Sequence, residues 1–223
     1  MTIPEFEAAV FAQKPTPAGH YDSEYFTGDW RAGGNNYSIE TRRQIEAKNP
    51  ALIKDVFQPV RVLDLGCGPG ALMHLLGELG VDADGIDFAE GSRRLATPEV
   101  RDRIAIGTTY DRIKPDNAYD LVICREVLEH LTVFQVKKTV ENMARVTSRF
   151  IYCTTRFHPE PASLVDFTTQ FDVDPTHITL LNKEFLRLLF VLEGCRSRPD
   201  LEARMDWLNK GRVLVMEKQH LPL

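Results

Sequence analysis

The stretch VLDLGCGPG, residues 62–70, decides the fold of this 223-residue chain. An apolar run ends near Asp64, glycines follow at 66, 68 and 70, and the helix-like ALMHLLGELG comes next. This order predicts a buried strand, a turn in which glycine leaves room for a ligand, and a helix whose N-terminus faces that ligand. The glycines alone are ambiguous, because they also fit a dinucleotide-binding turn and many glycine turns bind nothing.

Two further segments narrow the choice. The run DADGIDF carries Asp87 about twenty residues past the glycines, where an acidic side chain accepts hydrogen bonds from both ribose hydroxyls of a nucleoside. The run YDLVICREVLEHL, residues 119–131, predicts a strand that opens into a segment bearing glutamate and histidine. Together the three segments predict a nucleoside-binding sheet edge with ionisable groups beside it.

In these motifs the chain resembles the class I S-adenosylmethionine-dependent methyltransferases, whose hallmarks are a D-x-G-x-G-x-G turn, an acidic end to the second strand and a fourth strand often followed by E-V-L-E-H. The resemblance covers roughly residues 55–217. Other readings of the same residues are a Rossmann-like domain that binds nothing and a nicotinamide enzyme. The resemblance implies S-adenosylmethionine as cofactor, with Asp64 near its amino group, Gly66, Cys67, Gly68 and Gly70 in the turn, Asp87 on the ribose and Phe88 on the adenine.

The rest of the chain predicts an α/β fold. Strand and helix patterns alternate from residue 60, which implies right-handed crossovers and a Rossmann-like, seven-stranded, mostly parallel sheet with helices on both faces. By resemblance, the last strand is antiparallel and lies between the fifth and the sixth. We expect helices over 133–147 and from the Asn182 cap to Leu192. The strands are expected near 60–65, 83–87, 103–107, 119–124 and 149–154, with a weaker one near 195–205 and the last over 211–218.

The chain divides into an N-terminal helical segment, 1–58, and an S-adenosylmethionine-binding domain, 59–223. After a short amphipathic helix over 5–12, the segment is rich in glycine, proline and asparagine. It also carries too many aromatic rings for a solvated tail, since disordered segments are poor in them. We therefore expect it to pack over the domain as a lid. The rings are Tyr21, Tyr25, Phe26, Trp30 and Tyr37.

Composition limits the partners and the compartment. The net charge of −5 disfavours a nucleic-acid binder that uses a broad basic face, although a small RNA substrate stays possible. The four cysteines have no C-x-x-C spacing, which favours reduced thiols over disulfides or zinc, and hence a cytoplasmic location. No apolar run approaches the ~18 residues of a membrane span.

The acceptor site is predicted after the fourth strand. If the segment is helical, Glu126, Glu129 and His130 stand at i, i+3 and i+4 and project from one face. Two carboxylates held so close repel each other unless a proton or a cation relieves them. His177 follows a loop that returns to the same edge. Where the third strand ends, the resemblance implies a residue that contacts the adenine amino group, and Thr108, Tyr110 and Asp111 are the alternatives.

Glu-x-x-Glu-His with a later histidine resembles the metal set of RNA 3′-terminal 2′-O-methyltransferases and of ubiquinone-pathway O-methyltransferases. The resemblance implies Mg²⁺, Mn²⁺ or Fe²⁺ on Glu126, Glu129, His130 and His177, with His130, His177 and Glu126 as the catalytic set. E-V-L-E-H is also common without a metal, where its groups cap a helix and line the pocket.

These features predict methyl transfer from S-adenosylmethionine to a hydroxyl of a sugar or another small polyhydroxylated metabolite. The alternatives are N-methylation of an amino sugar, RNA 2′-O-methylation, and a non-catalytic S-adenosylmethionine-binding partner subunit.

Overall fold

The computed structural model of the chain describes residues 2–21, 23–28, 36–158, 165–166 and 176–219. Its centre is a seven-stranded sheet in the order β3-β2-β1-β4-β5-β9-β8. The first five strands run parallel, and β9 runs antiparallel to both of its neighbours, so the predicted topology is confirmed. The strands are β1 (Arg61–Leu65), β2 (Asp82–Asp87), β3 (Ile104–Ile106), β4 (Tyr119–Arg125), β5 (Thr147–Thr154), β8 (Cys195–Ser197) and β9 (Val213–Lys218).

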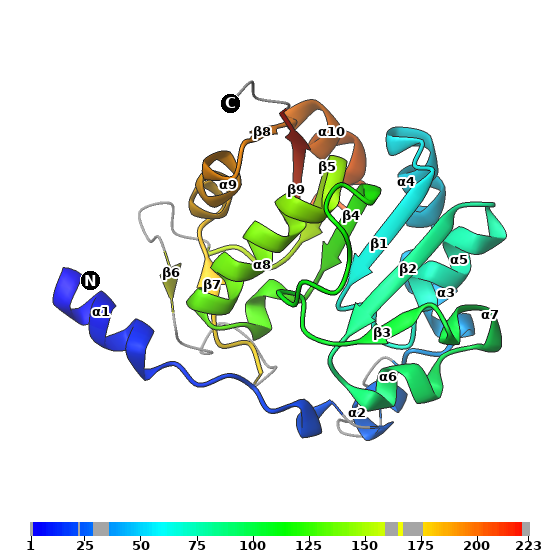
Figure 1. Cartoon of the computed structure of the whole chain (residues 1–223), viewed down its shortest axis with the longest axis horizontal. Helices are drawn as coiled ribbons and strands as arrows, with labels where there is room; N and C mark the ends of the chain where they lie inside the picture. Colours follow the sequence, from blue (N-terminus) through cyan, green and yellow to red (C-terminus); the bar gives the residue numbers. More distant parts are fainter. Residues whose placement is uncertain (1, 22, 29–35, 159–164, 167–175, 220–223) are drawn as a thin grey trace.

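Helices cover both faces of this sheet (Figure 1). Successive strand residues point to opposite faces, so the sheet contributes side chains to two apolar cores. One core joins α8 and α9 to the sheet, and the other joins α4, α5 and α10. The helices are α1 (Ile3–Ala12), α2 (Ser23–Thr27), α3 (Ile39–Glu46), α4 (Asn49–Phe57), α5 (Ala71–Glu78), α6 (Glu90–Leu95), α7 (Pro98–Arg101), α8 (Val133–Val146), α9 (Lys183–Leu192) and α10 (Pro199–Met205), with 3₁₀ turns η1 (Ala18–His20) and η2 (Leu128–His130).

Local sequence signals account for the helix ends that position the site. Thr132 caps α8 in a capping box with Gln135, and Asn182 caps α9, which ends before Gly194 as predicted. The prediction of a strand over 195–205 is wrong beyond its first three residues. Pro199 there begins α10, because its fixed φ suits the first turn of a helix. A small sheet of β6 (Val165–Asp166) and β7 (Leu180–Leu181) lies outside the seven predicted strands.

The N-terminal segment crosses the edge at which the parallel strands end. Phe6 and Val10 of α1 face α8 and α9, and the chain then runs along that edge to α2, beside α6 (Figure 1). Four of the five predicted rings pack together there against Phe88, and Trp30 lies outside the described residues. We call these four the aromatic cluster: Tyr21, Tyr25, Phe26 and Tyr37.

The cysteines and the helices agree with two simpler expectations. All four cysteines are free thiols and are buried, as the absence of paired spacing predicts. Within the described ranges, no helix is long and apolar enough to cross a membrane.

Candidate active site

The glycine turn lies between β1 and α5 and takes a backbone shape that only glycine adopts readily. Gly66, Gly68 and Gly70 have φ angles of 75°, 52° and 76°. A Cβ on Gly66 would lie 2.4 Å from Val127 Cγ2, so a side chain has no room there. The Gly66 and Cys67 amides donate to the Ile86 carbonyl, which fixes the turn against the end of β2.

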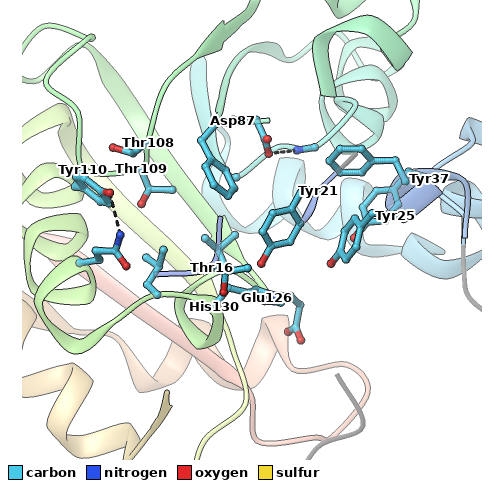
Figure 2. Close-up of a pocket in the computed structure, with 17 residues that line it drawn as sticks. Thr16, Tyr21, Tyr25, Tyr37, Asp87, Thr108, Thr109, Tyr110, Glu126 and His130 are labelled. Carbon is cyan, nitrogen blue, oxygen red and sulfur yellow. Dashed lines mark hydrogen bonds between the residues drawn. The ribbon is translucent and has the colours of Figure 1, made fainter. Parts of the chain in front are cut away.

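Asp87 ends β2 directly beside this turn. Its Oδ2 accepts from the Gly68 amide at 2.8 Å (Figure 2). Its Oδ1 accepts from the Ala89 amide at 3.0 Å. The carboxyl group is buried, and burial raises its pKa above the usual value. The acidic group that the sequence predicts at the second strand end is therefore held in a fixed orientation at the wall of a cavity.

That cavity of about 110 Å³ lies at the carboxyl ends of the parallel strands. The glycine turn, the end of β2, the third-strand loop, the segment after β4 and the aromatic cluster all contribute to it. Its wall consists of Thr16, Tyr21, Tyr25, Phe26, Tyr37, Gly66, Gly68, Asp87, Phe88, Thr108, Thr109, Tyr110, Glu126, Val127, His130, Leu131 and Gln135.

Three residues predicted to bind the cofactor are not in that wall. Asp64 is buried in β1, where burial raises its pKa to about 7 while the nearby Arg125 guanidinium opposes the rise. Cys67 points into the core, with its Sγ 2.6 Å from where a Cβ on Gly85 would stand. Gly70 caps α5. Contacts of these three with a cofactor stay predictions.

The loop after β3 carries the three residues that were predicted as alternatives for contacting the adenine amino group. Thr108 and Tyr110 line the cavity, as does Thr109, which the sequence did not single out. The carboxylate of Asp111 instead accepts from the Thr108 amide at 2.8 Å. Tyr110 is fixed from α8, since its hydroxyl accepts from Gln135 Nε2 at 3.0 Å (Figure 2).

The segment after β4 is not the α-helix that would place three side chains on one face. Glu126 has a left-handed φ of 52°, its amide donates to the Thr154 carbonyl at 2.7 Å, and a 3₁₀ turn follows. The carboxylate of Glu126 is 45% exposed, lines the cavity and lies 3.7 Å from Arg212 Nη1. The predicted geometry is therefore wrong, although Glu126 still lines the cavity.

Glu129, His130 and His177 come together, as predicted, but Glu126, the fourth predicted ligand, is not part of this group. Their potential ligand atoms all lie within 4.8 Å of one another, and the two imidazole rings are 4.6 Å apart between centroids. Glu129 is 1% exposed. Burial, together with the charge of Glu126, raises its pKa to about 8.

Two threonines orient this group, and sequence reasoning missed both. Thr155 Oγ1 donates to Glu129 Oε2 at 2.8 Å, and Thr176 Oγ1 lies 2.8 Å from His130 Nδ1. The other oxygen of Glu129 is buried and has no hydrogen-bond partner among the described residues. A buried carboxylate oxygen beside two imidazoles is a donor set that fits a divalent cation.

Behind the cavity lies a buried ion-pair network that the sequence does not reveal. Arg125 Nη1 donates to Glu46 Oε2 at 2.7 Å, and Arg42 donates to the other oxygen of Glu46 at 2.6 Å. Arg125 is the neighbouring cation that opposes the raised pKa of Asp64. The network therefore connects α3 to the strand end beneath the glycine turn.

A glycine turn against a buried strand-end aspartate, on a sheet with β9 inserted antiparallel, defines a class I S-adenosylmethionine-dependent methyltransferase. The comparison with protein families agrees. Residues 37–196 match the family model described as "Methyltransferase domain", and the chain belongs to that family.

Curated relatives match part of the chain. The chain is 36% identical over 76 residues to a ubiquinone biosynthesis O-methyltransferase of Bradyrhizobium diazoefficiens, and 28% identical over 105 residues to one of Rickettsia conorii. These matches cover 32% and 45% of this chain, and 30% and 35% of the relatives. The chain thus spans about a third of the length of the curated relatives it matches.

Solved structures share the fold. A "SAM dependent methyltransferase" from Archaeoglobus fulgidus has a TM-score of 0.62 at 19% identity, covering 88% of this chain and 97% of its own. Magnesium protoporphyrin IX methyltransferase from Synechocystis, solved with bound SAM, has a TM-score of 0.60 at 18% identity, covering 90% and 91%.

Proposed function

We propose that the chain transfers the methyl group of S-adenosylmethionine to a hydroxyl of a small acceptor, with a sugar or another polyhydroxylated metabolite as the expected class. One observation carries this proposal. The side chains of Glu129, His130 and His177 lie together beside the cavity, and Asp87 and the glycine turn line the same cavity. The curated relatives, which are named O-methyltransferases, support oxygen as the acceptor atom.

The cofactor end of the site is assigned to the glycine turn and the end of β2. Asp87 accepts from the ribose hydroxyls, and Phe88 packs on the adenine, whose far edge reaches Thr108 and Tyr110. Gly66 and Gly68 face the methionine moiety from the cavity wall, and the predicted contacts of Asp64, Cys67 and Gly70 with it come from outside that wall.

The N-terminal segment, 1–58, acts as a cover over this end. The cavity of about 110 Å³ is smaller than the ~150 Å³ that holds a benzene molecule, so it is too small for the cofactor as it stands. Tyr21 lines this cavity and contacts both sides of the site, with ring centroids 5.2 Å from Phe88 and 5.8 Å from His130. We therefore expect the aromatic cluster, which includes Tyr21, to shift when the cofactor binds.

At the acceptor end, Glu129, His130 and His177 would hold Mg²⁺ or Mn²⁺, with Glu126 facing the same space from the cavity. When bound, such a cation supplies the Lewis acidity that lowers the pKa of an alcohol. Thr176 Oγ1, 2.8 Å from His130 Nδ1, orients the ring that would bind the cation or take the acceptor proton. Methyl transfer needs little more than this positioning and deprotonation.

The aromatic cluster favours a second acceptor class, a hydroxyl on an aromatic ring. Rings from Tyr21, Tyr25, Phe26 and Tyr37 line one side of the cavity, and aromatic pairs contribute about 0.5–1.5 kcal/mol beyond their buried area. An amino sugar would instead need a proton acceptor and no cation.

The test is a methyl-transfer assay with labelled S-adenosylmethionine and a panel of polyols, nucleoside sugars, phenols, amino sugars and short RNA. We expect labelled ethers from a hydroxyl acceptor, and activity that a chelator removes and Mg²⁺ or Mn²⁺ restores. Labelled amines formed under chelation would replace the proposal with N-methylation. If RNA is the only labelled product, RNA replaces the small polyhydroxylated metabolite as the acceptor class.

A further inference from the structure

His177 reaches the site from a segment far along the chain, and backbone hydrogen bonds fix its two following neighbours. The amides of Ile178 and Thr179 donate to the carbonyl of Glu129 at 2.8 and 3.1 Å. Thr179 Oγ1 also donates to the Leu131 carbonyl at 2.6 Å. The segment that carries His177 is therefore attached to the turn that carries Glu129 and His130.

Gln13, at the end of α1, joins a third segment to these two. Its Oε1 accepts from the amide of Val133 at 2.8 Å. Its Nε2 donates to the carbonyl of Ile178 at 3.1 Å and lies 2.8 Å from Thr179 Oγ1. The Val133 amide belongs to the first turn of α8 and has no partner within that helix. One half-buried side chain thus bridges the start of α8 and the residues after His177.

These bonds require glutamine. Glutamate would keep the acceptor for the Val133 amide but would lose both donors, and its charge would face the Ile178 carbonyl. Asparagine is one methylene shorter. Methionine has a similar length and keeps the packing of the stem, but it removes all three bonds.

We propose that Gln13 is a positioning residue that holds His177 beside Glu129 and His130. The N-terminal segment, which precedes the family match at residue 37, would then complete the acceptor site rather than only cover it. This inference rests on the proposed function for its chemical purpose, but the placement of His177 can be measured without any methyl transfer.

The effect is expected to be local. Phe6 packs against the core next to α8 and α9, and Val10 is 7% exposed, so α1 keeps its own apolar contacts when Gln13 is replaced. The cofactor residues of β2 lie on other elements. Loss of Gln13 should therefore change His177 and leave the binding of S-adenosylhomocysteine as it is.

The experiment compares Gln13→Met and Gln13→Glu with Gln44→Met, in which the replaced glutamine is exposed on α3. Three measurements on the whole chain follow His177: the nuclear Overhauser effect between the His130 and His177 rings, hydrogen exchange at the Ile178 and Thr179 amides, and Mn²⁺ affinity by electron paramagnetic resonance. S-adenosylhomocysteine affinity by calorimetry is the internal control.

For Gln13→Met we expect loss of the ring-to-ring signal, at least tenfold faster exchange at both amides, and Mn²⁺ affinity lower by about 10- to 100-fold. S-adenosylhomocysteine affinity should stay within about twofold, and Gln44→Met should match the wild type. Gln13→Glu, which keeps the Val133 bond, should still lose the ring-to-ring signal. If Gln13→Met does not fold, Gln13→Glu still tests the positioning role.

An unchanged ring signal and unchanged amide exchange in both Gln13 variants would overturn the positioning role. If the wild type binds no Mn²⁺ and methylates no hydroxyl, but the Gln13 variants still lose the ring signal, the proposed function fails and the positioning role of Gln13 stands.

Discussion

Replacing Asp87 with alanine should abolish binding of S-adenosylhomocysteine, because it removes the carboxylate that accepts hydrogen bonds from the ribose hydroxyls. A carboxylate offers about four acceptor positions. The amides of Gly68 and Ala89 take one on each oxygen, and the nearby Ser92 hydroxyl directs its proton to the Ala89 carbonyl at 2.6 Å. The Ser92 hydroxyl also lies beside this carboxylate, and the remaining positions of the carboxylate are those that accept from the two hydroxyls of a ribose.

Each of those two bonds is charge-assisted and contributes about 1.5–3 kcal/mol. Their loss corresponds to about 3–6 kcal/mol, or a drop in affinity of about 10² to 10⁴. Isothermal titration calorimetry with S-adenosylhomocysteine measures this drop. The control is Asp102→Ala, whose carboxylate is 92% exposed at the surface after α7.

The fold should survive the Asp87→Ala substitution, because the sheet is held by two separate apolar cores. The unpaired Gly68 and Ala89 amides should lower the free energy of unfolding by about 1–3 kcal/mol each, as a thermal or urea melt will show. An Asp87→Ala protein that is folded and binds S-adenosylhomocysteine as tightly as the wild type would remove Asp87 from the cofactor site.

Three further predictions concern the rest of the site. First, burial raises the pKa of Asp64 to about 7, so between about pH 4 and 7 the folded state holds a proton that the unfolded state has released. Asp64 therefore lowers the free energy of unfolding as the pH rises over this range. This loss of unfolding free energy is on the order of 4 kcal/mol, and Asp64→Asn should remove it. Urea melts at about pH 4 and about pH 7 measure it. If the variant and the wild type differ by the same amount at both pH values, the prediction is contradicted. Second, Tyr21→Ala should raise the rate of S-adenosylhomocysteine association by opening the cavity, and stopped-flow rates identical to the wild type would show that Tyr21 does not limit entry. Third, His177→Ala should reduce hydroxyl methylation about 10- to 100-fold while cofactor affinity stays unchanged; full activity of this variant under chelation would leave His130 as a base acting without a cation.

The fold could be predicted in detail because its signals are local. The run around Asp64 and the later alternation of strand and helix each extend over enough residues to show their period. The order of the strands, and the antiparallel β9, followed from the resemblance to class I methyltransferases rather than from the residues themselves. The prediction failed where a short strand meets a helix at Pro199, since three residues are too few to fix a strand end.

The candidate site was predictable in its residue types but not in its geometry. The spacing of Glu126 and Glu129 suggested one helical face, but the backbone at Glu126 is left-handed, and no residue of a strong turn-forming type announces it. Thr155 and Gln13 orient the site through hydrogen bonds to residues distant in sequence. A single sequence carries no signal for such pairs, because the fold alone brings them together.

The most direct test of the central claim is a crystal structure of the chain grown with S-adenosylhomocysteine and Mn²⁺, with anomalous data collected for manganese. The account predicts the ribose of S-adenosylhomocysteine on the carboxylate of Asp87, and an anomalous peak between Glu129, His130 and His177. Ribose density away from Asp87, or the absence of manganese from that triad at saturating concentration, would contradict it.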